Sequence, residues 1–137
     1  LTPYSDAPIN VHWGYDNRTV GLRVPISAPV ARRVENRLAG ADANPYLAMA
    51  ATLAAGYLGL KEKLTPAKAV DGDAYRFAYA LPRHLHDSLY KLNHSRPLKD
   101  TLGEQFVKVL SEVKSYEHEL YMRVISSWER ENLLLNV

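Results

Sequence analysis

The chain has 137 residues, of which 47% are hydrophobic and 23% charged, and its formal net charge is +2. This composition is typical of a globular domain and excludes a disordered chain. The small net charge gives no support for a nucleic acid or an acidic membrane surface as partner, so neither is expected. The absence of cysteine excludes disulfides, thiolate metal sites and cysteine nucleophiles. No apolar run reaches the ~18 residues of a membrane span and no signal peptide opens the chain, so a cytoplasmic location is expected.

The first part of the chain, up to about residue 43, has the pattern of short strands. Turn-forming residues separate the extended stretches, and one stretch alternates so that Val20, Leu22 and Val24 share a face. The expected strands cover residues 9–15, 19–24 and 32–38. We therefore predict a few antiparallel strands in this part.

A helix is predicted directly after the strands. Asn44-Pro45 is a favourable helix start, because asparagine caps and proline lacks the N–H group that the first turn leaves unpaired. The helix is expected to run to about Leu60. Since it has almost no polar face, we predict that it is buried nearly all round.

The rest of the chain also has helical patterns. Leucines at helical spacing indicate a short helix, and two capping boxes, Thr101 to Glu104 and Ser126 to Glu129, would open two more. The expected helices cover residues 82–93, 101–125 and 129–136. Strands followed by helices predict an α+β fold class.

The residues most informative about function are charged side chains on the expected strands. In an extended stretch Arg33, Glu35 and Arg37 point to one face, and Arg18 and Arg23 lie on a neighbouring segment. Arginine forks clamp phosphate or carboxylate oxygens, and a carboxylate among them can hold Mg²⁺. The pattern therefore fits a polyanionic ligand that arrives with a divalent cation. The alternative that the residues leave open is a solvent-exposed strand face whose charges pair with one another.

Four consecutive segments resemble signature segments of the glutamine synthetase family, in the family's order and close to its spacing. They are residues 13–18 (WGYDNR), 22–25 (LRVP), 31–37 (ARRVENR) and 43–47 (ANPYL). The resemblance extends more loosely over nearly the whole chain. It implies that residues 1–137 are a single, incomplete domain, the C-terminal part of a glutamine synthetase catalytic domain. Strands over about residues 9–38 would precede mostly helical structure over about residues 44–136.

The resemblance also implies a chemistry. In this family ATP phosphorylates the γ-carboxylate of glutamate, and an amine then displaces phosphate to form an amide. Arginines and Mg²⁺ (or Mn²⁺) neutralise the negative charge of the reacting groups. Family members are homo-oligomers, typically dodecamers, with the active site between two subunits. The implied cofactors are therefore ATP and Mg²⁺ (or Mn²⁺), the implied substrates are glutamate and ammonia or a polyamine, and the chain on its own is expected to be inactive.

The resemblance assigns a role to each charged residue of the strands. Glu35 resembles the ligand of the metal that bridges to the nucleotide phosphates. Arg37 resembles the arginine that contacts glutamate and the transferring phosphoryl group, and Arg18 resembles one shared between nucleotide phosphate and glutamate. Arg23 and Arg33 resemble contacts to the nucleotide. The implied catalytic and substrate-binding residues are thus Arg18 and Arg37, and the implied metal ligand is Glu35.

Three features bear on the branch of the family and on regulation. Val30 stands where many bacterial members carry a lysine, in a connection one residue shorter, and this weakens the expected nucleotide contacts of that loop. Residues 35–38 and 128–134 are more similar to the γ-glutamyl-polyamine (γ-glutamylputrescine) synthetase branch than to ammonia-using members. Tyr79 lies where some bacterial members carry an adenylylated tyrosine, but its flanking alanines favour an unmodified residue.

A second hypothesis is a non-catalytic, mostly helical assembly module, derived from such a ligase and inactive in isolation. Metal-binding carboxylates encoded upstream of Leu1 would favour the ligase. A translation start at or near Leu1 would favour the module.

Overall fold

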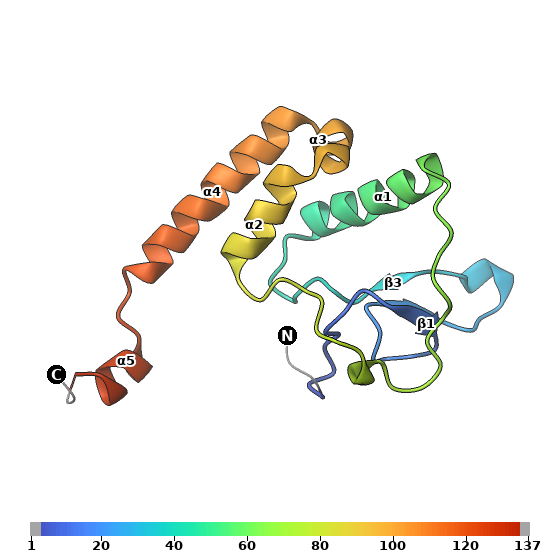
Figure 1. Ribbon diagram of the computed structural model, residues 1–137, viewed down its shortest axis with the longest axis horizontal. Coiled ribbons are helices and arrows are strands. Elements are labelled where there is room, and N and C mark those ends of the chain that lie inside the picture. The colour runs from blue at the N-terminus through green and yellow to red at the C-terminus, as the bar shows by residue number, and fades with distance from the viewer. Residues whose placement is uncertain (1–3, 135–137) are drawn as a thin grey trace. The chain divides into compact units, whose positions relative to one another are not determined.

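A computed structural model describes residues 4–134 of the chain (Figure 1). The chain divides into two compact units, Leu1–Arg83 and His84–Val137. The first unit holds a small sheet and one long helix, and the second holds only helices. This arrangement confirms the α+β class. Within the described residues no helix is both long and apolar enough to cross a lipid bilayer.

Three short strands form one sheet in the order β1-β2-β3. The strands are β1 (Trp13–Tyr15), β2 (Leu22–Val24) and β3 (Glu35–Asn36). β2 and β3 are antiparallel, as predicted, but β1 and β2 run parallel, and this corrects one expected pairing. The connection between β1 and β2 leaves the sheet at Asp16, whose φ is 43°, and returns to the end where β1 began. Leu22 N accordingly donates to His12 O at 3.0 Å.

A later segment of the first unit holds these strands in place. Val70 N donates to Trp13 O (2.8 Å), the Asn17 side chain donates to Gly72 O (2.7 Å), and Ala74 N donates to the Thr19 hydroxyl (2.8 Å). The small core beneath these contacts consists of Val20, Val70 and Ala74. The loop between β1 and β2, which carries Arg18, is therefore fixed by residues more than 50 positions away in the sequence.

The long helix of the first unit, α1 (Pro45–Lys61), begins where Asn44-Pro45 predicted it. The Asn44 side chain accepts hydrogen bonds from Tyr46 N at 3.0 Å and from Leu47 N at 3.3 Å. In the chain by itself α1 is not buried all round. Ala54 is the helix's one buried residue, and Leu53 is 74% exposed.

α1 stays exposed because the other described helices and strands of its unit hardly pack against it, although Asn36 of β3 donates to the Thr52 hydroxyl of α1 at 2.9 Å. A helix of 17 residues is about 25 Å long, whereas a strand of three residues extends over about 10 Å. Two strands of three residues and one of two can cover only a small part of the helix surface. The large apolar side chains that stay more than half exposed are Tyr46, Met49, Leu53, Tyr57 and Leu60.

Among the described residues the second unit contains four helices, of which α2, α4 and α5 correspond to predicted helices, whereas α3 was not predicted. The four helices are α2 (Leu85–His94), α3 (Arg96–Leu102), α4 (Glu104–Met122) and α5 (Ser127–Asn132). α2, α3 and α4 pack against one another around the fully buried Val107. Ser111 of α4 also donates to the Asn93 side chain of α2 at 3.0 Å.

One of the two expected capping boxes is present. Ser126 and Glu129 exchange hydrogen bonds as predicted, with Glu129 N to Ser126 Oγ at 3.2 Å and Ser126 N to Glu129 Oε2 at 2.7 Å. The prediction of a capping box at Thr101 is wrong, because Thr101 lies inside α3 and its hydroxyl donates to Pro97 O. Gly103, with φ of 93°, precedes α4 instead. The last helix differs from its predicted range of 129–136, because α5 begins at Ser127 and ends at Asn132, before the described residues Leu133 and Leu134. Residues 135 and 136 of that range lie outside the described residues.

Candidate functional site

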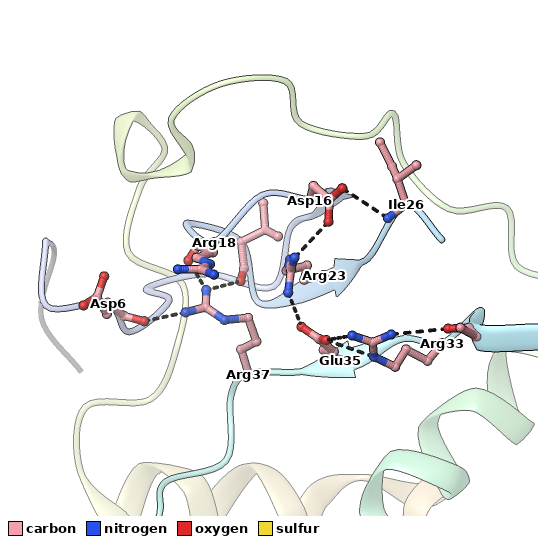
Figure 2. Close-up of polar contacts among 10 residues, drawn as sticks. Asp6, Asp16, Arg18, Arg23, Ile26, Arg33, Glu35 and Arg37 are labelled. Atoms are coloured by element: carbon pink, nitrogen blue, oxygen red, sulfur yellow. Dashed lines mark hydrogen bonds and ion pairs between the residues drawn. The ribbon is translucent and has the colours of Figure 1, made fainter. Parts of the chain in front are cut away.

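The centre of the site is a carboxylate between two guanidinium groups (Figure 2). Arg23 of β2 lies directly opposite Glu35 of β3 in the antiparallel pair. Arg23 Nη1 contacts Glu35 Oε2 at 2.8 Å, and Arg33 Nη2 contacts Glu35 Oε1 at 2.9 Å. The Glu35 side chain is 30% exposed and lies outside the apolar core. The alternation of charges on the third strand thus correctly predicted that Arg33 and Glu35 lie on one side.

A second carboxylate completes the cluster, and sequence reasoning missed it. Asp16 Oδ1 contacts Arg23 Nη2 at 2.8 Å, and Asp16 Oδ2 accepts from Ile26 N at 3.2 Å. Asp16 stands among the turn-forming residues between the expected strands 9–15 and 19–24, and no role was predicted for it. Its position beside Arg23 depends on the parallel pairing of β1 with β2, which the strand pattern did not predict. We refer to Asp16, Arg23, Arg33 and Glu35 as the charged cluster.

The charged cluster shifts the protonation of its own members. The hydrogen bond from Arg23 is the main reason that the pKa of Glu35 lies below its ordinary value, and Arg33 lowers it further. The same hydrogen bond raises the pKa of Arg23, with a smaller contribution from Asp16. With two carboxylates and two guanidinium groups, the cluster is neutral when all four are ionised.

The other two arginines lie near each other but outside the cluster. The Arg37 guanidinium donates to the backbone oxygens of Asp6 (2.6 Å), Val20 (3.3 Å) and Arg18. Figure 2 shows this fork directed toward Asp6 and Arg18 and away from Glu35. Arg18 is exposed, and its carbonyl is one of the oxygens that Arg37 binds. The structure therefore brings Arg23, Arg33 and Glu35 together. It corrects the expectation that Arg37 joins them, because the Arg37 guanidinium lies with Arg18 instead.

An open cavity of about 680 Å³ lies next to the charged cluster. This volume is in the range of sites for small molecules and cofactors. Its wall comes mainly from the connection between β2 and β3, which includes Ile26, Ser27 and Arg33. Ser27 Oγ is buried and has no hydrogen-bond partner. A polar ligand in the cavity would meet the Arg33 guanidinium in the cavity wall.

The carboxylate of the site suits a metal ion that takes most of its ligands from phosphate and water. Among residues 4–134 no three His, Cys, Asp or Glu side chains gather into a metal-binding group. Mg²⁺, however, commonly binds through one or two carboxylates and takes its other ligands from phosphate and water. Glu35 supplies one such carboxylate, and a cation there would compete with Arg23 and Arg33 for its oxygens.

Comparison with known proteins identifies the family. The family model described as "Glutamine synthetase, catalytic domain" matches residues 1–133. The chain belongs to the glutamine synthetase family. It is 36% identical to a glutamine synthetase of Halobacterium salinarum over 98% of this chain and 32% of that protein. It is 38% identical to a glutamate–isopropylamine ligase of a Pseudomonas species over 88% of this chain and 27% of that protein.

The relatives are all much longer than this chain. The match to type-1 glutamine synthetase 2 of Dictyostelium discoideum, at 38% identity, covers 93% of this chain but 26% of that protein. The chain therefore spans between about a quarter and a third of the length of these curated relatives. The comparisons show that the chain belongs to the glutamine synthetase family. The activity of a whole ligase is a proposal for this chain.

Proposed function

We propose that the chain contributes the phosphate-facing arginines of an ATP-dependent glutamate–amine ligase. In this reaction the γ-carboxylate of glutamate attacks the γ-phosphorus of ATP, and ADP leaves. An amine then attacks the resulting acyl phosphate, phosphate leaves and an amide forms. The observation that carries the proposal is the position of Glu35 between Arg23 and Arg33, beside a cavity of about 680 Å³.

Each member of the cluster has a task that its chemistry supports. Glu35 would hold Mg²⁺ (or Mn²⁺) that is bound to the nucleotide phosphates, and the metal would supply neutralising charge during phosphoryl transfer. Arg23 and Arg33 would bind phosphate oxygens, since a planar guanidinium can donate two parallel hydrogen bonds. Both arginines already lie within hydrogen-bond distance of the carboxylate that would hold the metal.

Arg18 and Arg37 would act on the glutamate side of the reaction. Arg18 is exposed and would contact both a nucleotide phosphate and glutamate. Arg37 would contact glutamate and the transferring phosphoryl group. Its fork now binds backbone oxygens, and the contact to Asp6 O joins it to a segment far away in the sequence. A substrate carboxylate that displaced this contact would exchange a neutral acceptor for a charged one, which forms the stronger hydrogen bond.

The amine is proposed to be a polyamine such as putrescine, with ammonia as the alternative. Residues 35–38 and 128–134 support the polyamine branch, and one relative is named for an alkylamine, isopropylamine. We also propose a cytoplasmic homo-oligomer, with the dodecamer that is typical of the family. The exposed apolar side chains of α1 support association, because large apolar patches usually mark contact surfaces.

The same observation favours a second candidate, a non-catalytic assembly module. α1 exposes five large apolar side chains along its length, and such a surface suits packing against another protein surface. A module of this kind would have no need for the charged cluster to bind a ligand. The two candidates therefore differ in whether ATP and Mg²⁺ bind.

The test is phosphate release from ATP by the purified protein, measured with glutamate and with putrescine, isopropylamine or ammonia. A whole ligase that contains residues 1–137 should release phosphate only when ATP, glutamate and amine are all present, with the highest turnover on putrescine, whereas the chain on its own should bind Mg²⁺–ATP without turnover. In parallel, calorimetry measures whether Mg²⁺–ATP binds to the chain. Nucleotide binding without turnover would limit the chain to a binding role within the ligase. If the chain shows no turnover and does not bind Mg²⁺–ATP, the assembly module is the function that remains.

A further inference from the structure

Asp16 contacts both Arg23 and the cavity wall at Ile26, and the proposed function assigns it no role. Its Oδ1 contacts Arg23 Nη2 at 2.8 Å, and its Oδ2 accepts from Ile26 N at 3.2 Å in the cavity wall. Its own N–H donates to Val24 O at 3.1 Å. Figure 2 shows the two side-chain contacts, which together with the backbone contact fix Asp16 relative to β2 and to the cavity wall.

The two ends of the Arg23 fork go to different carboxylates. Nη1 contacts Glu35 and Nη2 contacts Asp16, both at 2.8 Å. The Arg23 Nε atom is buried and has no hydrogen-bond partner, so these two contacts are what holds the guanidinium in position. If Glu35 turns its oxygen toward a metal, Arg23 loses one of them. The contact with Asp16 would then be the one that still holds the Arg23 side chain. Without it, this long side chain would regain rotamer freedom.

We propose that Asp16 is a positioning residue for the nucleotide. It keeps Arg23 directed toward the phosphates while Glu35 holds the metal, and it keeps Ile26 in place in the cavity wall. This inference rests on the proposed function, because it needs Mg²⁺–ATP as the ligand of the cluster. It predicts that the contribution of Asp16 becomes large only when the metal and the nucleotide are both present.

Two substitutions separate this role from a general effect on folding. Asp16→Asn keeps the side-chain size and tolerates the positive φ of 43°, but it removes the charge and one of the two acceptor oxygens. Asp16→Gly removes the side chain and suits the same backbone conformation, so the turn should survive. Asp71→Asn is the matched control, because Asp71 is an exposed aspartate of the same unit outside the cluster and the cavity wall.

The experiment measures the Kd of Mg²⁺–ATP by calorimetry for the chain and its variants. Loss of a hydrogen bond to a charged group should raise this Kd about tenfold in Asp16→Asn and at least as much in Asp16→Gly. Asp71→Asn should match the parent. A second readout is the NMR signal of Arg23 Nε–H. In Asp16→Asn this signal should stay sharp without ligand, when Glu35 still holds Arg23, and should broaden when Mg²⁺–ATP is added.

The outcomes distinguish this inference from the function on which it rests. If Glu35→Ala abolishes Mg²⁺–ATP binding but both Asp16 variants bind like the parent, the role of Asp16 is refuted and the proposed function stands. If the parent itself binds no Mg²⁺–ATP, the proposed function fails and the inference fails with it. An Arg23 signal that broadens equally with and without ligand would show a purely structural role and would also overturn the proposal.

Discussion

At the scale of single residues, Glu35 controls how the charged cluster responds to pH. Its pKa is lowered, first by the hydrogen bond from Arg23 and then by Arg33. A carboxylate with a lowered folded-state pKa contributes stability that is fully present above its unfolded pKa. That stability is lost as the pH falls through the lower, folded-state value. The ion pairs of Glu35 should therefore be intact throughout the neutral range.

This leads to a prediction for acid titration. The carboxyl carbon of Glu35, followed by NMR, should titrate with a midpoint below the ordinary glutamate value of about 4.3. The difference in unfolding free energy between the parent and Glu35→Gln should be constant near neutral pH and should shrink only in that acid range. A Glu35 midpoint at or above the value in an unfolded peptide of the same sequence would show that the two arginines do not hold the carboxylate in solution.

Arg37 provides a prediction about stability. Its guanidinium joins the backbone oxygens of Asp6, Arg18 and Val20, and Arg37→Ala would leave all three without this donor. The unfolding free energy should fall by about 1–3 kcal/mol, with Arg37→Lys restoring part of the loss because an ammonium cannot reproduce the fork. Urea denaturation measures both. An unchanged unfolding free energy in Arg37→Ala would show that these contacts do not stabilise the chain.

Sequence reasoning could predict part of the site, for a physical reason. Alternation along a strand predicted that Arg33 and Glu35 share a side, because it depends only on local geometry. The direction of the Arg37 fork could not be predicted, since its partner Asp6 O is 31 positions away. Asp16 was missed because its contact with Arg23 depends on how two strands pair.

At the scale of elements, the start of α5 depends on one side chain. Ser126 and Glu129 form the capping box, and the hydrogen bond from the Ser126 backbone lowers the pKa of Glu129. Ser126→Ala should destabilise α5 by about 1 kcal/mol, since an orphan N–H at the first turn loses its acceptor. Hydrogen exchange of the amides in residues 128–132 should then be faster, while exchange in α4 is unchanged. Equal exchange rates in parent and variant would contradict the role of the box.

The elements also show where local signals suffice and where they fail. The Asn44-Pro45 signal predicted the start of α1, because capping is a local interaction. The Thr101 signal failed because Pro97 lies in the first turn of α3, which extends through Thr101 and ends before Gly103. The parallel pairing of β1 and β2 was not predicted, because a connection this short usually joins antiparallel strands.

At the scale of the whole molecule, the exposed surface of α1 predicts self-association. From Tyr46 to Leu60 the helix has no charged side chain, so a second copy can approach it without like-charge repulsion. Sedimentation at increasing concentration should show association of the parent, and Leu53→Glu should weaken it by placing charge in the contact. Val30→Glu is the control, since Val30 is an exposed apolar residue outside α1. A parent that stays monomeric, or equal effects of both substitutions, would exclude α1 as the contact surface.

The central claim is that the charged cluster binds a divalent metal together with nucleotide phosphate. The most direct measurement is paramagnetic broadening of the chain's NMR signals by Mn²⁺–ATP. We expect broadening centred on Glu35, Arg23 and Arg33. It should be weaker with Mn²⁺ alone, because one carboxylate holds the metal poorly without phosphate, and absent in Glu35→Ala. Broadening elsewhere in the chain, or the same broadening around residue 35 in Glu35→Ala, would contradict the claim.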